Sequence, residues 1–299
     1  MRVASFNLLS GKSPDDNTVR EDRLIDAVKT LDADILGLQE VDVGQRRSSG
    51  LDLTSIVAAA MGAVAHRFEP TLIGAPEDPW RRAHPGETYS AAYGIALVSR
   101  FPVLDWRAIR LPYTPMQAPI LLPGSGQVIF TRDEPRMALA ALIDTPAGPL
   151  TVVNTHLSFL PGWNVRQLRR LVHTVDELGG AAVIMGDLNM PGRLPTVVSR
   201  WRAAVTACTW PAHRPVAQLD HILISPGGPA VRGGDTLRLP LSDHVAVYAD
   251  LADTPLPSAE PPPARSTAAV WKALPAPHAR PAPGTRSPVT ARPASGTRS

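Results

Sequence analysis

Asp187 and Asn189 are the first residues whose types and spacing suggest chemistry, because they follow the apolar run 183–185 and Gly186. A short apolar run closed by glycine is typical of a buried strand. Side chains two positions apart on an extended chain point the same way. The sequence therefore predicts a carboxylate and a carboxamide that are aimed at one place from a rigid strand end. The competing interpretation is an Asp and an Asn that form an ordinary turn.

Polar residues of similar types stand at or near the ends of other expected strands: Asn7, Glu40, His156, Asp220, Asp243 and His244. Each one alone has an ordinary explanation as a solvated charge, a core histidine with a satisfied hydrogen bond, or a cap. Because the ends of neighbouring strands converge in space, their joint occurrence predicts a single site. Carboxylate and amide oxygens suit a hard cation such as Mg²⁺ or Mn²⁺, and the absence of a Cys/His cluster argues against structural zinc.

The elements that must position these residues are strands that alternate with helices and hairpins. We expect strands at 3–6, 35–38, 64–68, 95–99, 183–185, 219–224 and 245–248, amphipathic helices at 24–31, 51–61 and 165–178, and a hairpin made of 137–143 and 150–155. The strand at 35–38 is expected to carry Glu40 at its tip, and 70–93 to form a long surface loop. Pattern alone predicts an α/β or α+β fold.

A second hairpin is expected around 120–122 and 128–130, joined by the turn-forming residues 123–126. One interpretation is a hairpin packed on the body. The other is an exposed apolar finger that grips a substrate or touches a membrane.

Composition bounds the class of protein. A chain of 299 residues with 44% hydrophobic content can bury one large core or two small ones. Its first residues do not form a signal peptide, and no stretch has the roughly 20 apolar residues of a membrane span. Cys208 is the only cysteine, which excludes an internal disulfide and fits a reducing compartment; we expect it to be buried. These features predict a cytoplasmic monomer without an integral membrane segment.

Residues 252–299 differ in composition from the rest, because they hold eleven of the 32 prolines and almost no large apolar side chains. We expect a disordered Pro/Ala/Arg-rich tail, which could dock a partner, after a catalytic domain at 1–251. The tail carries six cations and two anions, so it accounts for +4 of a net charge of +3 and leaves the body near −1. Global charge is therefore no argument for nucleic-acid binding.

The motifs together resemble the endonuclease, exonuclease and phosphatase superfamily of metal-dependent phosphoester hydrolases. The resemblance covers residues 1–251 and lies in the segments 5–7, 38–40, 154–157, 186–189, 219–222 and 242–244, with 93–99 and Arg136 as further features. It implies an α+β, four-layer sandwich in which two mixed β-sheets pack face to face with helices on the outside. It is specific for the superfamily but not for a branch within it.

The resemblance also implies roles for the site residues. Glu40 would bind Mg²⁺ or Mn²⁺, with Asn7 and Asp243 on the metal side. His244 would be the general base or a transition-state contact, oriented by Asp220. Asp187 and Asn189 would orient the attacking water and contact phosphoryl oxygens, and His156 would donate to a non-bridging oxygen or the leaving group. Arg136 would bind the substrate.

Three functions remain open at this stage. The first is a nuclease acting on DNA or RNA, favoured by Arg107, Arg110, Arg132 and Arg136 around the second hairpin. The second is a phosphodiesterase or phosphatase for a lipid or small molecule, favoured by the apolar residues of that hairpin. The third is an inactive binding scaffold that recruits partners through the tail. Every expected site position carries a chemically competent residue, which argues against the scaffold.

Overall fold

The protein is built around two large β-sheets. The computed structural model describes residues 1–75, 80–84, 86–114, 117–121 and 128–253. Seven strands form the first sheet, in the order β14 (Val231–Leu237), β15 (Ala246–Leu251), β1 (Arg2–Asn7), β2 (Ile35–Val43), β5 (Ala92–Ser99), β3 (Ala65–Ile73) and β4 (Arg81–Arg82). Six form the second, in the order β12 (Arg202–Ala203), β13 (Asp220–Ile224), β11 (Ala182–Asp187), β10 (Gly148–His156), β9 (Met137–Thr145) and β6 (Val103–Arg110).

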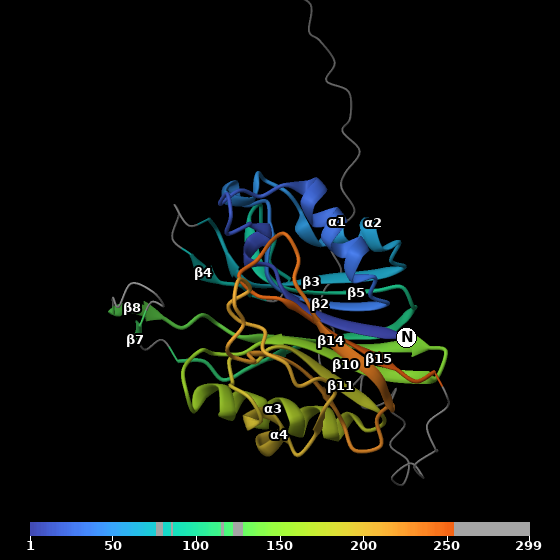
Figure 1. Cartoon of the computed structure of the whole chain (residues 1–299). Helices are drawn as coiled ribbons and strands as arrows, with labels where there is room; N and C mark the ends of the chain where they lie inside the picture. The colour runs from blue at the N-terminus through green and yellow to red at the C-terminus, as the bar shows by residue number, and fades with distance from the viewer. Residues whose placement is uncertain (76–79, 85, 115–116, 122–127, 254–299) are drawn as a thin grey trace, which may run out of the picture.

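Helices cover the outer faces of both sheets. Figure 1 shows α1 (Glu21–Leu31) and α2 (Leu53–Met61) on one side, and α3 (Trp163–Leu178) and α4 (Leu194–Ser199) on the opposite side. One apolar cluster lies under α1 and α2, another lies under α3 and α4, and a third fills the space between the sheets. The expected α+β sandwich with two mixed sheets is confirmed.

Each sheet contains one parallel pair of strands, and these two pairs determine where the site forms. In the first sheet β1 runs parallel to β2, and in the second β10 runs parallel to β11. The carboxyl ends of parallel strands lie at the same edge of a sheet. Asn7, Glu40, His156 and Asp187 are therefore brought toward one end of the sandwich.

Three expectations about elements need correction. Glu40 is not at a strand tip, since β2 continues to Val43 and the β2–β5 register shifts between Leu38 and Val41. The segment 70–93 is not wholly a loop, because β3 extends to Ile73 and β4 pairs with it. Cys208 is exposed rather than buried.

The second hairpin is confirmed in its backbone, since β7 (Gln117–Leu121) pairs antiparallel with β8 (Val128–Arg132). The turn of this hairpin at 123–126 lies outside the described residues. The tail from residue 254 onward also lies outside them, so the disorder of the tail and its docking of a partner stay predictions. Among the described helices, none is both long and apolar enough to cross a membrane.

Candidate active site

Asn7 joins the two sheets at the edge where the parallel strands end. Its Nδ2 donates to Glu40 Oε1 at 3.1 Å and to Asp187 Oδ2 at 3.1 Å, and its Oδ1 accepts from the Leu9 amide at 3.1 Å. Because Glu40 comes from β2 and Asp187 from β11, one amide side chain holds a carboxylate of each sheet. The site is thus assembled across the interface of the sandwich.

Gly186 allows β11 to place Asp187 beside β10. Its φ is +149°, and a Cβ at this position would lie 1.8 Å from the Thr155 carbonyl oxygen. Only glycine fits such a close approach of two backbones. The glycine that marks the motif in the sequence is therefore what sets Asp187 opposite His156 in the strand register.

Asp187 and Asn189 do meet, but not for the reason that strand alternation gave. The strand β11 ends at Asp187, and Asn189 has a left-handed backbone with φ of +49°. The backbone N–H of Asn189 donates to Asp187 Oδ1 at 3.0 Å, and the side-chain Nδ2 of Asn189 lies 3.2 Å from His156 Nε2. The turn is thus part of the site instead of an alternative to it.

His156 is a buried histidine whose protonation is disfavoured. Its pKa lies well below the ordinary value of 6.5 because of burial, with the positive charges of Arg136 and His244 acting in the same direction. Asn189 Nδ2 donates toward Nε2 and to the Leu157 carbonyl oxygen. The same Nε2 lies 3.5 Å from Asp187 Oδ2, so this ring nitrogen faces both an amide donor and a carboxylate.

Asp220 and His244 form a hydrogen-bonded dyad. Asp220 Oδ2 lies 2.8 Å from His244 Nδ1, which directs Nε2 to the other side, 3.9 Å from Asp187 Oδ2. Burial lowers the pKa of His244, but the charge and hydrogen bond of Asp220, with the charge of Asp187, outweigh it and raise the pKa to about 10. The dyad is the arrangement that fixes one imidazole tautomer for catalysis.

The backbone around the dyad is held by two hydroxyl side chains to which the sequence analysis assigned no role. Thr209 Oγ1 accepts from the Asp220 amide at 3.1 Å, and the Thr209 carbonyl accepts from Val245 at 2.9 Å. Ser242 Oγ donates to the Asn7 carbonyl and accepts from the His244 amide. Ser242 lies in the segment 242–244 that carries the resemblance, without an assigned role, whereas nothing in the sequence marks Thr209, since Thr is common in turns.

The carboxylates of half-buried Glu40 and buried Asp187 fit a divalent cation. Burial raises the pKa of Glu40 to about 7, against the opposing Asn7 hydrogen bond and with the nearby Glu134 charge adding to it. Burial, with the charge of Asp220, raises the pKa of Asp187 to about 6. Hard oxygen donors held close together in this way are what Mg²⁺ and Mn²⁺ bind, and a cation offsets the cost of burying their charge.

Two positions among the described residues could hold a cation. One is Glu40 with Asn7. The other is the trio of Asp187, Asp220 and His244, whose ligand atoms lie within 4.8 Å of one another. The hydrogen bond between Asp220 and His244 already joins two members of the trio, so the first position leaves the dyad intact.

Asp243 makes hydrogen bonds to residues 210 and 212. Its Oδ2 accepts from Trp210 Nε1 at 3.2 Å, and its carbonyl accepts from the Ala212 amide. These contacts connect Asp243 to the loop before β13, and its negative charge also favours protonated His244. Its place on the metal side stays a prediction.

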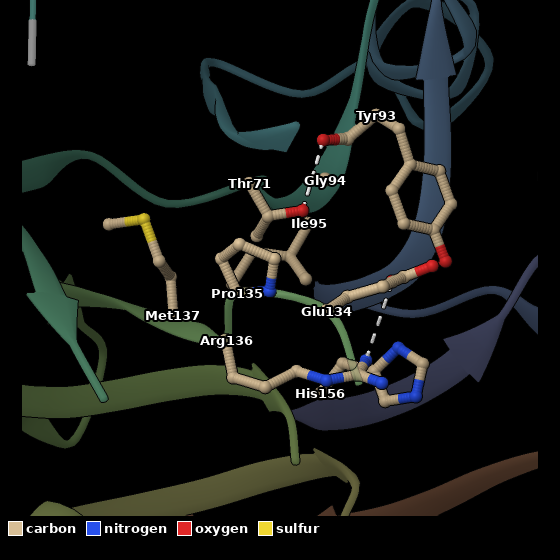
Figure 2. A pocket seen from close by; sticks show the side chains of 9 residues that line it. All are labelled: Thr71, Tyr93, Gly94, Ile95, Glu134, Pro135, Arg136, Met137 and His156. Atoms are coloured by element: carbon tan, nitrogen blue, oxygen red, sulfur yellow. Dashed lines mark hydrogen bonds and ion pairs between the residues drawn. The ribbon is translucent and has the colours of Figure 1, made fainter. Parts of the chain in front are cut away.

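Arg136 is buried beside the site and is held by carboxylates of its own chain. Its Nε and Nη2 lie 3.3 and 3.1 Å from Asp133 Oδ1, and Glu134 is 3.8 Å from Nη1. Figure 2 shows Arg136, Glu134, Tyr93 and His156 around a small pocket. The guanidinium therefore supplies positive charge at this wall, although part of its hydrogen-bonding capacity is already used.

Comparisons with known proteins agree on one family. The model of the Endonuclease/Exonuclease/phosphatase family matches residues 4–244. No curated protein matches the sequence significantly. The chain resembles an endonuclease/exonuclease/phosphatase from Beutenbergia cavernae with 23% identity and a TM-score of 0.64, over 87% of this chain and 73% of the other.

Two further solved structures are similar in fold. The catalytic domain of human Nocturnin with a bound sulfate is 20% identical, with a TM-score of 0.57, and the match covers 84% of this chain and 93% of that domain. A mannosyl-6-phosphatase from Bacteroides thetaiotaomicron is 17% identical, with a TM-score of 0.56 over 84% and 99%. At these identities the likeness is one of fold.

Proposed function

Because the chain belongs to the endonuclease/exonuclease/phosphatase family, we propose that it is a divalent-metal-dependent hydrolase of phosphodiesters, with DNA as its substrate. The observation that carries the proposal is the meeting of the Asp220–His244 dyad with the Asn7-linked carboxylates of both sheets. Such a site has what phosphoester hydrolysis needs: oriented proton-transfer groups, amide donors and hard ligands for a cation.

Glu40 and Asn7 would hold the metal, with Asp243 as a further candidate on that side. When bound, Mg²⁺ or Mn²⁺ supplies positive charge that stabilises the phosphoryl group and the leaving oxygen. Asn7 would have to exchange part of its present bonding, since its Nδ2 now donates to Glu40 and Asp187.

The remaining residues would act on water and phosphate. Asp187 and Asn189 lie side by side to orient the attacking water. His244 would meet the transferring group through Nε2, because Asp220 binds Nδ1. His156 and the guanidinium of Arg136, which line the same small pocket, would contact phosphoryl oxygens from the side of that pocket.

The arginines support DNA less than their sequence positions suggest. Arg110 is exposed at the end of β6, whereas Arg107 and Arg136 are buried. The near-neutral body and these buried arginines favour a second candidate, a small phosphoester such as a sugar phosphate. The mannosyl-6-phosphatase of the same fold is consistent with it.

The test is hydrolysis by the purified full chain with Mg²⁺ or Mn²⁺. The panel contains plasmid DNA, an abasic duplex, RNA, sphingomyelin, a small phosphodiester and a sugar phosphate. Cleavage of DNA that stops on chelation is the expected result. If only the small phosphoesters are hydrolysed, DNA is not the substrate and the second candidate takes its place. Activity that survives EDTA would refute the proposed dependence on a divalent metal.

A further inference from the structure

Asn154 is a fully buried polar side chain that the proposed chemistry does not use. It lies two residues before His156 on β10, so both side chains leave the same face of the strand. That face is turned toward the first sheet, because Asn154 bonds to residues of β2 and β5.

The amide of Asn154 is fully engaged at the register shift in the first sheet. Its Nδ2 donates to the carbonyl oxygens of Leu38 and Ala96, each at 2.8 Å. Its Oδ1 accepts from Gln39 Nε2 at 2.6 Å, and Gln39 Nε2 also lies 3.1 Å from Ser5 Oγ. Leu38 and Ala96 are the last paired residues of β2 and β5 before the shift. A side chain of the second sheet therefore supplies hydrogen bonds at the place where the β2–β5 ladder is interrupted.

Glu40 follows directly in this irregular segment and has an unusual backbone. Its φ is +52°, a left-handed conformation that is unfavourable for a non-glycine residue and persists only where its surroundings enforce it. The neighbours that enforce it include Leu38 and Gln39, both held by Asn154.

We infer that Asn154 is a positioning residue that sets the distance between Glu40 and the His156–Asp187 half of the site. The inference rests on the proposed metal-dependent function. Apolar packing between the sheets is non-directional and tolerates small slides, whereas three hydrogen bonds at one amide fix a register. Asn154 and His156 lie on the same face of β10, and Glu40 belongs to β2. When the hydrogen bonds of Asn154 hold β10 in place against β2, they therefore also hold His156 in place relative to Glu40.

Gly37 provides the space that this amide occupies. A Cβ on Gly37 would lie 2.7 Å from Asn154 Oδ1 and 2.9 Å from Met185 Cε. The φ of Gly37 is not in the left-handed region, so alanine would fit its backbone. A Gly37→Ala variant would therefore displace the Asn154 amide without removing it.

The test measures binding of Mn²⁺ to the full chain by electron paramagnetic resonance, which needs no substrate. Asn154→Leu keeps the size of the side chain and removes its hydrogen bonds. The matched control is Thr155→Val, since Thr155 is equally buried on the opposite strand face and donates only to the Met137 carbonyl. We expect Asn154→Leu and Gly37→Ala to weaken Mn²⁺ binding by about 10-fold or more, as changes behind metal ligands do, and Thr155→Val by less than about twofold.

The outcomes separate this inference from the function. If the wild type binds Mn²⁺ and a folded Asn154→Leu binds it equally well, the positioning role is refuted while the function stands. An equal loss in Thr155→Val would also refute it, because the effect would then be general loosening of the core. If Asn154→Leu does not fold, Gly37→Ala decides by the same comparison. A wild type that binds no Mn²⁺ and hydrolyses no phosphoester overturns the proposed function and this inference with it.

Discussion

Replacing Glu40 by glutamine should make the metal-free protein more stable while removing its ability to bind metal. Burial raises the pKa of Glu40 from about 4.5 to about 7, so folding favours the neutral carboxyl. The protonated carboxyl therefore contributes to the free energy of unfolding fully below pH 4.5, and this contribution is lost as the pH rises through 7. Each pH unit corresponds to about 1.4 kcal/mol, so ionised Glu40 destabilises the fold by roughly 3 kcal/mol at pH 8. Because Glu40 keeps partial contact with solvent, this is an upper limit.

Glutamine has the same shape and can still accept from Asn7 Nδ2, but it does not titrate. Urea denaturation with EDTA should therefore give equal stabilities at pH 4.5 and a more stable variant at pH 8. With Mg²⁺ at about 100 times its Kd, the wild type should gain roughly 2.7 kcal/mol and Glu40→Gln almost nothing, which offsets nearly all of the variant's advantage at pH 8. The exposed Asp26→Asn serves as the charge control. A Glu40→Gln variant no more stable than the wild type at pH 8 in EDTA would refute the burial argument.

Three further predictions concern the dyad, the strand pair and the ion pair of buried Asp42 with half-buried Arg47. His244→Ala should lower kcat by about 100-fold or more with an unchanged circular dichroism spectrum, as loss of a proton-transfer group does, and wild-type turnover would contradict its role. Gly186→Ala should destabilise folding by more than about 4 kcal/mol or yield insoluble protein, since its Cβ would overlap the Thr155 carbonyl; a soluble variant with an unchanged melting temperature would contradict this. Arg47→Met should cost roughly 3 kcal/mol in urea unfolding, because it leaves fully buried Asp42 without its bidentate partner, and adding Asp42→Asn should recover most of the loss; no recovery would contradict the pairing.

Many of the strands and helices could be predicted from the sequence because their signals are local, whereas the sandwich was implied only by the resemblance to the family, since pattern alone predicts an α/β or α+β fold. Apolar runs such as Ile35–Leu38 and the spacing of Leu168, Leu171 and Val175 record burial directly, and these segments form β2 and α3. The polar residues then stand out because they follow such runs. Which role each plays stays a prediction, since chemistry depends on the protonation and distances of several groups at once.

What the sequence could not reveal is backbone conformation in the irregular segments. Glu40 and Asn189 both have positive φ, and neither is a glycine that would have advertised it. Extended geometry was therefore assumed for both, which placed Glu40 at a strand tip and derived the Asp187–Asn189 contact from strand alternation. Likewise, the bond from Trp210 to Asp243 spans 33 residues and has no sequence signal.

The composition of the layer between the sheets explains how site residues that come from both sheets can be held at fixed distances from one another. Far from the site, this layer is apolar, with Ile35, Val152 and Ile222 fully buried. Toward the site it becomes polar, first at Asn154 and Gln39 and then at Asn7, which contacts the carboxylates. Apolar contacts stabilise the sandwich but do not specify its register to a fraction of an ångström, and unpaired polar groups in the same place would be costly. The hydrogen bonds that Asn7 and Asn154 make between the sheets lie where the candidate site residues of both sheets meet, so directional contacts hold the register at the place where those residues must be aligned.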